Sequence, residues 1–153
     1  MSPRLVPVTI TRVMVAVDGS DHSKKAAELA IHLAKLWNAQ LYFIHVLEED
    51  NVPSWFREFA KVERLGTADY FDVVDRRLFA PLIARAKESE IQVFSGIRAR
   101  GDPAEEILRN AERKKVDLIV MGSRGLGKFS RVILGSVSTK VLSNAKCTCI
   151  TVK

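Results

Sequence analysis

A nearly continuous apolar run, R-V-M-V-A-V at residues 12–17, is the sequence feature that most limits the possible folds. A strand with one solvated face alternates apolar and polar residues, whereas a continuous run fits a strand buried on both faces. The run ends at Asp18-Gly19-Ser20, a combination typical of a tight turn. Apolar residues then recur at helical spacing, at Ala26, Ala30, Leu33 and Trp37. The sequence therefore predicts a central strand followed by an amphipathic helix over about residues 23–38.

The same alternation of strands and helices continues along the chain. Further strands are predicted at residues 41–46, 91–97, 117–121 and 147–152. Helices are predicted at residues 67–90, with a kink or a restart at Pro81, at 103–114 and at 136–144. Residues 48–66 indicate a loop with a short helix. Asp102 is the expected N-cap of the helix that begins at Pro103. This alternation implies a parallel sheet with right-handed crossovers and helices on both faces.

The strand order follows from where the unusual residues lie. Asp18-Gly19-Ser20 follows the first strand, and a glycine-rich run follows the fourth. Ligands of such sheets bind at the carboxyl ends of the strands, where the strand order reverses. We therefore expect the first and fourth strands to be neighbours in one five-stranded α/β domain over residues 1–153, with the order 3-2-1-4-5.

Composition sets the broad class of protein. A chain of 153 residues, 47% hydrophobic and 27% charged, is long enough for one domain with a sizeable core. No stretch approaches the roughly 20 apolar residues of a membrane span, and two cysteines are too few for a disulfide framework, so a cytoplasmic location is expected. The net charge of +6 suits an anionic ligand. Nucleic acid is not expected, because no strand surface interleaves aromatic with basic residues.

The glycine-rich run from Met121 to Ser138 predicts a phosphate site. Glycines at positions 122, 125, 127 and 135 let backbone N–H groups approach an anion closely. Residues 136–138 then begin a helix whose free amides and dipole favour negative charge. Residues 122–128 also match the first part of a Walker A loop, but Phe129 replaces the hydroxyl that binds Mg²⁺. A P-loop NTPase is therefore not favoured.

The better description of the run is G-x2-G-x9-G-[S/T], with Gly122, Gly125, Gly135 and Ser136 in register. With this motif the sequence resembles the ATP-binding subgroup of the universal stress protein family. The resemblance covers nearly the whole chain, through V-A-V-D-G-S at the first strand end, D-L-I-V-M-G-S-R-G at the fourth, and L-G-S-V-S-T-K-V-L in the last helix.

The resemblance implies a Rossmann-like, adenine nucleotide alpha hydrolase-like fold and a site for ATP, with Mg²⁺ held by the phosphates and not by protein side chains. It assigns the adenosine half to Asp18 and to the backbone of Ala16, Val17 and Val46. Met121, Gly122 and Gly125 would line the ribose and α-phosphate, and Gly135, Ser136, Val137 and Ser138 would hold the outer phosphates. Gly19, Ser20, Arg124, Gly127 and Lys128 complete the expected site. The implied function is a cytosolic stress-response or regulatory protein, homodimeric through the C-terminal strand, in which nucleotide occupancy acts as a switch.

Plainer interpretations stay open for several of these residues. The glycines also suit a tight connection between a strand and a helix, and Asp18 also suits a turn cap. Lys128 and Arg131 either neutralise phosphates or are solvated. A nucleotide-dependent enzyme of the ATP pyrophosphatase or adenylyl transferase type is the alternative function, although such enzymes usually carry S-G-G-x-D-S where this chain has D-G-S-D-H-S at residues 18–23.

No catalytic group is predicted. Asp18, Ser20 and His22 crowd one turn, which does not suit a nucleophile triad, and His45 is interpreted as a hydrogen-bonded core histidine. The three histidines show no metal-ligand spacing. Cys147 and Cys149 are expected on one face of the last strand as small, reduced side chains. Any ATP hydrolysis is therefore expected to be slow.

Overall fold

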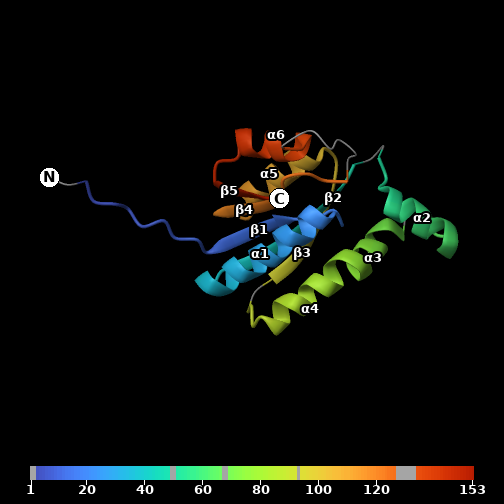
Figure 1. The fold of residues 1–153 in the computed structure, drawn as a ribbon, viewed down its shortest axis with the longest axis horizontal. Coiled ribbons are helices and arrows are strands. Elements are labelled where there is room, and N and C mark those ends of the chain that lie inside the picture. The colour runs from blue at the N-terminus through green and yellow to red at the C-terminus, as the bar shows by residue number, and fades with distance from the viewer. Residues whose placement is uncertain (1–2, 49–50, 67–68, 93, 127–133) are drawn as a thin grey trace.

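Five parallel strands form the sheet at the centre of the fold (Figure 1). The computed structural model describes residues 3–48, 51–66, 69–92, 94–126 and 134–153. The strands are β1 (Arg12–Ala16), β2 (Gln40–Leu47), β3 (Phe94–Arg100), β4 (Leu118–Gly122) and β5 (Thr148–Val152). Their order is β3-β2-β1-β4-β5, which confirms the predicted topology.

Helices cover both faces of this sheet, as predicted. They are α1 (Asp21–Trp37), α2 (Ser54–Glu63), α3 (Tyr70–Val74), α4 (Ala80–Glu88), α5 (Pro103–Arg113) and α6 (Ser136–Asn144). Figure 1 shows α5 and α6 on one face, with α1, α3 and α4 on the other. Each face has its own hydrophobic core. The alternate side chains of β1 supply both, because Val13 and Val15 lie in the α1 layer and Met14 lies in the α5–α6 layer.

The strand β3 begins three residues later than the predicted range of 91–97. Glu90 has a left-handed backbone with φ of 62°, and the amide of Ile91 donates to the carbonyl of Ala86 at 3.1 Å. Ile91 is therefore buried as part of the chain reversal after α4, and not as a strand residue. The predicted start of the strand at residue 91 was wrong, because an apolar residue is buried equally well in a strand or at a helix end.

The predicted helix over residues 67–90 is divided into three parts. In the described residues α3 is followed by a π-helical turn, η2 (Asp75–Phe79), and then by α4, which carries Pro81 in its first turn. The backbone stays helical from η2 into α4, where the Ala80 amide donates to the Asp75 carbonyl. The π-helical turn thus changes the hydrogen-bond pattern directly before Pro81, which has no amide donor.

Two helices begin with side-chain caps. The Ser20 hydroxyl accepts from the amide of Ser23 at 3.2 Å at the start of α1, which begins earlier than predicted. The Asp102 carboxylate accepts from the amide of Glu105 at 2.9 Å, as predicted for α5. Such caps satisfy amides that the helix itself leaves free. In the described parts of the chain, no helix has the length and apolar character needed to cross a membrane.

Residues 3–10 extend away from the sheet at the amino end of β1 (Figure 1). Asp117 holds this segment where it enters the fold: its Oδ2 accepts from the Thr11 amide at 2.8 Å, the Thr11 hydroxyl at 2.9 Å and the Arg12 amide at 3.0 Å. Burial raises the pKa of the Asp117 carboxyl, but these hydrogen bonds outweigh it and leave the pKa below its ordinary value.

We predict that Asp117→Asn lowers the free energy of unfolding at pH 7 by about 1 kcal/mol, after allowance for its partial exposure. The folded-state pKa lies below the unfolded value of about 3.9, so this stabilisation is present above that value and is lost as the pH falls through the folded-state pKa. Urea unfolding of both proteins from pH 7 to pH 3 checks this. A stability difference that does not shrink on acidification would contradict it.

Candidate functional site

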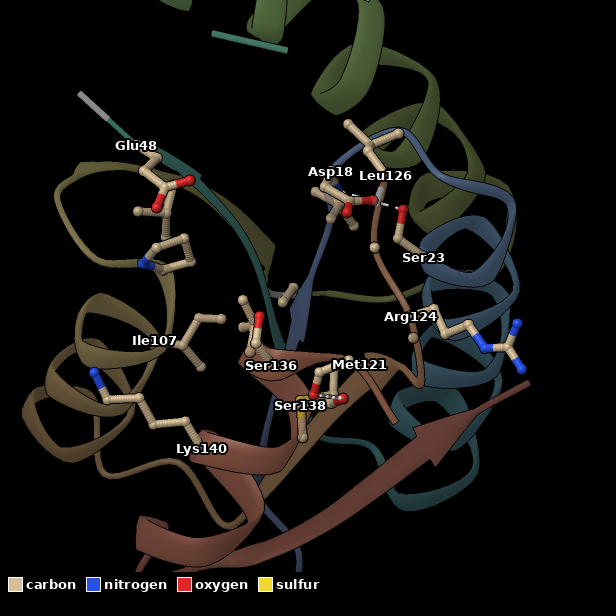
Figure 2. Close-up of a pocket in the computed structure, with 18 of the residues that line it drawn as sticks. Asp18, Ser23, Glu48, Ile107, Met121, Arg124, Leu126, Ser136, Ser138 and Lys140 are labelled. Atoms are coloured by element: carbon tan, nitrogen blue, oxygen red, sulfur yellow. Dashed lines mark hydrogen bonds between the residues drawn. The ribbon is translucent and has the colours of Figure 1, made fainter. Parts of the chain in front are cut away.

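A cleft of about 1140 Å³ opens at the carboxyl ends of β1, β2 and β4. This is the edge where the strand order reverses between β1 and β4, the usual position of ligands in such sheets. The start of α5 and most of α6 form one wall, and the segment from the end of β2 into α2 forms another. Figure 2 shows Ile107 and Lys140 on the α5–α6 side, with Asp18 and Leu126 across the cleft.

The cleft brings together most of the residues that the sequence assigned to the site. Those that line it are Ala16, Val17, Asp18, Val46, Met121, Gly122, Arg124, Gly125, Gly135, Ser136, Val137 and Ser138. Gly19 and Ser20 are not among its lining residues; Ser20 instead caps α1, and Gly19 forms the turn with φ of 85°. The remaining two expected residues, Gly127 and Lys128, lie outside the described residues, as do Phe129 and Arg131.

Asp18 caps the turn after β1 and also lines the cleft. Its Oδ1 accepts from the Ser20 amide at 2.9 Å, which is the turn-capping contact. The same side chain lines the cleft, and its Oδ2 lies 2.8 Å from the position that a Cβ on Gly125 would occupy. A side chain at position 125 would therefore displace the Asp18 carboxylate. The structure thus places the glycine run directly against the end of β1.

Gly122 has a packing role that the motif did not reveal. A Cβ at this position would lie 2.8 Å from the His22 Cβ, 2.9 Å from the His22 carbonyl carbon and 3.0 Å from the Arg124 carbonyl oxygen. The end of β4 therefore approaches the first turn of α1 more closely than any side chain allows. Gly122 is therefore needed for the packing of β4 against α1, which is a different role from the tight strand-to-helix connection considered for the glycines.

Ser123 fixes the start of α6. Its carbonyl oxygen accepts from the Gly135 amide at 2.7 Å and lies 3.0 Å from the Ser138 hydroxyl. Its own amide donates to the Val152 carbonyl in β5 at 2.7 Å. The Ser138 side chain is buried and also lies 3.0 Å from the Gly135 carbonyl. Ser138 therefore anchors the helix start, and Ser136 is the more exposed of the two expected phosphate-binding hydroxyls.

Arg124 and Lys140 are two of the described basic residues that line the cleft. Figure 2 shows the Arg124 side chain pointing away from Ser136 and Met121. The Lys140 Nζ lies 3.2 Å from a carboxylate oxygen of Asp102 and 3.2 Å from one of Glu105. The N-terminus of α6 itself favours negative charge through its free amides and its dipole.

His45 is a hydrogen-bonded core histidine, as predicted. Its Nδ1 lies 2.6 Å from the Val17 carbonyl oxygen and its Nε2 lies 2.5 Å from the Tyr70 hydroxyl. This fits an Nδ1–H tautomer that donates to Val17 and accepts from Tyr70. Burial lowers the pKa of His45, although the hydrogen bond to Val17 opposes the shift, and burial raises the pKa of Tyr70. The pair therefore stays neutral and connects α3 to the end of β1.

His22 contacts the residue that follows β4. Its Nδ1 lies 3.0 Å from the Ser123 hydroxyl, and Ser123 is only 1% exposed. A nucleophile must reach its substrate, so this pair holds α1 against β4 instead. Among the described residues, no group of three or more His, Cys, Asp or Glu side chains could hold a metal ion.

Sequence reasoning missed two walls of the cleft. The residues involved are Glu48, Asn51, Pro53, Ser54 and Arg57 beyond β2, Pro103 and Ile107 in α5, and Thr139, Ser143 and Asn144 in α6. Lys140 also lines the cleft, and the sequence places this basic residue just after the glycine run and four residues from Ser136, on the same helix face. The walls from α2 and α5 carry no motif, and only the tertiary arrangement places them here.

These features define the class of protein: a Rossmann-like α/β domain with a cleft at its switch point. The model of the universal stress protein family matches residues 9–153, and the chain belongs to that family. Universal stress protein YxiE of Bacillus subtilis is 36% identical over 146 residues, which cover 93% of this chain and 98% of that one.

Solved structures of similar fold include two complexes with small ligands. A universal stress protein in complex with cAMP has a TM-score of 0.64 and 24% identity, covering 94% of this chain and 97% of that chain. The universal stress protein from Archaeoglobus fulgidus in complex with dAMP has a TM-score of 0.63 and 18% identity, covering 95% and 99%. At these identities the likeness shows the fold alone.

The contacts at the two glycines predict different tolerances. Gly122→Ala forces α1 away from β4 and is expected to lower the free energy of unfolding by about 1 to 3 kcal/mol. At Gly135 an added Cβ would meet nothing closer than 3.5 Å, so Gly135→Ala is expected to cost no more than about 1 kcal/mol, from the poorer N-cap. Urea unfolding of the two variants measures both. Equal losses would contradict the packing role of Gly122.

Proposed function

We propose that this chain is a cytoplasmic stress-response or regulatory protein that binds ATP in the cleft, with nucleotide occupancy acting as its switch. The observation that carries the proposal is the N-terminus of α6, which opens into the cleft without a side-chain cap. Family membership supplies the stress-response context.

The start of α6 differs from the starts of α1 and α5 in ways that suit an anion. Ser20 and Asp102 cap the other two helices, and the first turn contains one acidic residue in α1 and two in α5. The N-cap of α6 is Gly135, which has no side chain, and the first turn of α6 contains no acidic residue. The amides at 136–138 precede the first possible intrahelical bonds. Together with the helix dipole they suit the phosphates of a nucleotide.

The other end of the cleft suits an adenosine group. Ala16, Val17, Ile44, Val46 and Met121 give it an apolar lining, the usual surface for a nucleobase. The Val17 amide donates to the Ile44 carbonyl at 2.9 Å, and the Val17 carbonyl accepts from His45. A carbonyl oxygen has two lone pairs, so Val17 retains one acceptor position for an amino group on the base.

The complexes of the two solved relatives support this class of ligand. Both cAMP and dAMP contain adenine, a sugar and a phosphate. The choice of ATP comes from the longer glycine motif, which leads from the end of β4 to a second group of amides at the start of α6. Mg²⁺ is proposed to bind through the phosphates. The described acidic side chains of the cleft are Asp18 and Glu48, and Asp18 is already engaged with the turn, so we expect occupancy and not rapid turnover.

A proline substitution tests the role of the α6 amides directly. Gly135 has φ of −73° and ψ of 167°, a conformation that permits proline at the next position, and Ser136 is the first residue of the helix, where proline is favoured. Ser136→Pro should therefore preserve the fold while it removes one amide donor. We predict a loss of ATP affinity of about tenfold or more by isothermal titration, as for a hydrogen bond to a charged group.

Ser136→Ala is the matched control, because it removes the hydroxyl and keeps the amide. Its expected loss is below about fivefold, as for one partly exposed contact. Wild-type protein should also release bound nucleotide on heating, which chromatography identifies. Equal affinities of the proline variant and wild type would exclude the α6 N-terminus as the phosphate site.

We further propose that the chain forms a homodimer through β5. This strand is one edge of the sheet, and an edge strand has unpaired backbone groups that suit pairing with a second copy. Lysine on an edge strand opposes such pairing. Light scattering should give twice the mass of one chain for wild type and a shift toward one chain for Thr148→Lys. Ser95→Lys, at the exposed surface of the opposite edge strand β3, should not change the mass. A monomeric wild type at micromolar concentration would refute the dimer.

A further inference from the structure

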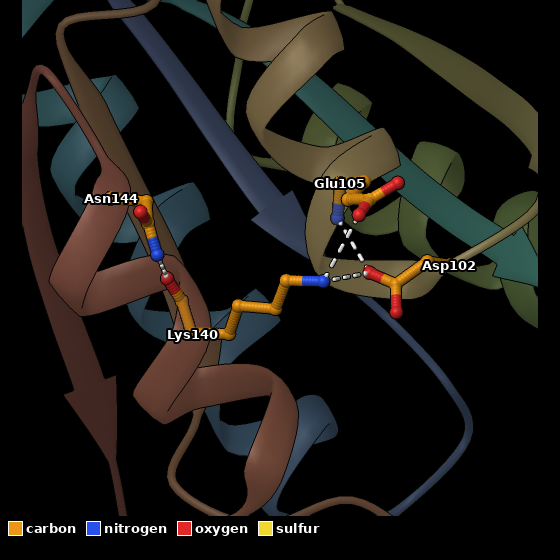
Figure 3. A network of polar contacts seen from close by, with 4 residues as sticks. All are labelled: Asp102, Glu105, Lys140 and Asn144. Carbon is orange, nitrogen blue, oxygen red and sulfur yellow. Dashed lines mark hydrogen bonds and ion pairs between the residues drawn. The ribbon is translucent and has the colours of Figure 1, made fainter.

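Lys140 joins α6 to the first turn of α5 across one wall of the cleft. Its Nζ lies 3.2 Å from the Asp102 Oδ1 and 3.2 Å from the Glu105 Oε1 (Figure 3). Both helices line the cleft on this side, and Lys140 itself is one of the lining residues. The bridge therefore lies beside the space that the nucleotide is proposed to occupy.

The bridge is of a kind that exchanges partners readily. All three side chains are exposed to a large degree, with Lys140 at 43%, Asp102 at 44% and Glu105 at 60%. Ion pairs at such exposure contribute little net stability. Asp102 also has a second partner, the Glu105 amide that it caps, and this hydrogen bond leads the causes that lower its pKa. Asp102 and α5 therefore keep their places when Lys140 leaves.

Lys140 is also placed to reach the start of α6. It lies four residues after Ser136 and on the same helix face. In the structure its side chain extends toward α5, where its Nζ contacts Asp102 and Glu105. The four-carbon side chain of lysine is flexible, so its ammonium group can move without a change in the helix backbone. The hydrogen bonds to Asp102 and Glu105 raise the pKa of Lys140, so it is charged in either position.

We propose that Lys140 is a switching cation: it bridges to Asp102 and Glu105 when the cleft is empty and transfers to the nucleotide phosphates when the cleft is filled. This inference rests on the proposed function. It specifies how nucleotide binding changes the protein surface: the transfer leaves the carboxylates of Asp102 and Glu105 without their counter-ion. Phosphate binding and the α5–α6 bridge then compete, and each weakens the other by the same factor.

The alternative is a static role, in which Lys140 stays on α5 and only neutralises its carboxylates. Both roles predict that Lys140→Gln weakens ATP binding and that Glu105→Gln strengthens it. They differ in how the two substitutions combine. If Lys140 transfers, part of the free energy of its phosphate contact is used to break the bridge to Glu105. Neutralising Glu105 removes that cost, so Lys140→Gln then causes a larger loss of ATP affinity. If Lys140 is static, Lys140→Gln causes an equal or smaller loss of ATP affinity when Glu105 is neutral.

The experiment is a double-mutant cycle on ATP affinity, measured by isothermal titration at low ionic strength. We expect Glu105→Gln to tighten ATP binding about twofold to threefold. Lys140→Gln should weaken binding about twofold in the wild-type background and about fivefold in the Glu105→Gln background, within the range of an exposed ion pair. Asp102 is left unchanged because it caps α5.

A second double-mutant cycle measures the free energy of urea unfolding with and without ATP. A static bridge keeps the same coupling free energy in both conditions. The coupling between positions 140 and 105 should be measurable without ATP and should disappear at saturating ATP. Lys146→Gln is the matched control: Lys146 pairs with Glu112 of α5 at 3.1 Å but does not line the cleft, so ATP affinity should be unchanged.

The possible results distinguish a failure of the Lys140 switch from a failure of the proposed nucleotide site. If wild type binds ATP and the loss from Lys140→Gln is equal or smaller in the Glu105→Gln background, the switch is overturned and the nucleotide site stands. The same holds if the unfolding cycle keeps its coupling at saturating ATP. If wild type shows no ATP binding, the proposed function fails together with the switch.

Discussion

The burial of β1 on both faces is the constraint on which the rest of the structure depends. Val13, Met14 and Val15 have no exposed surface, and each face of the strand enters a separate core. A strand in this position needs a neighbour on each side and a helix layer above and below. The chain meets this requirement by placing β2 on one side of β1 and β4 on the other. The divergence of the strand order there creates the cleft.

Much of this fold was predictable because apolar pattern and burial agree in most of the chain. The strand order followed from two loops of unusual composition, and the Asp102 cap followed from its spacing to Glu105. The start of β3 was not predictable in this way, since Ile91 is buried by a helix end. The division of residues 70–88 into α3, η2 and α4 also left no clear mark on the sequence.

The candidate site was predictable where it rests on a motif and not where it rests on tertiary packing. The glycine run correctly led to the strand end and to α6, but spacing could not show that Gly122 contacts α1 or that Ser138 is bound to the chain's own carbonyls. Ser123 makes these connections, joining β4 to β5 and to α6, although nothing in its position suggested it. The walls from α2 and α5 approach the cleft only through the packing of helices on opposite faces.

The parallel sheet also separates the two ends of the chain. All strands run in one direction, so residues 3–10 lie at the amino ends of the strands and the cleft lies at their carboxyl ends. The five residues of β1 separate the two ends by about 16 Å. The C-terminal strand instead finishes on the cleft edge, where the Val152 carbonyl binds Ser123. A reporter domain fused before residue 3 therefore leaves the cleft accessible, whereas one fused after Lys153 lies beside it.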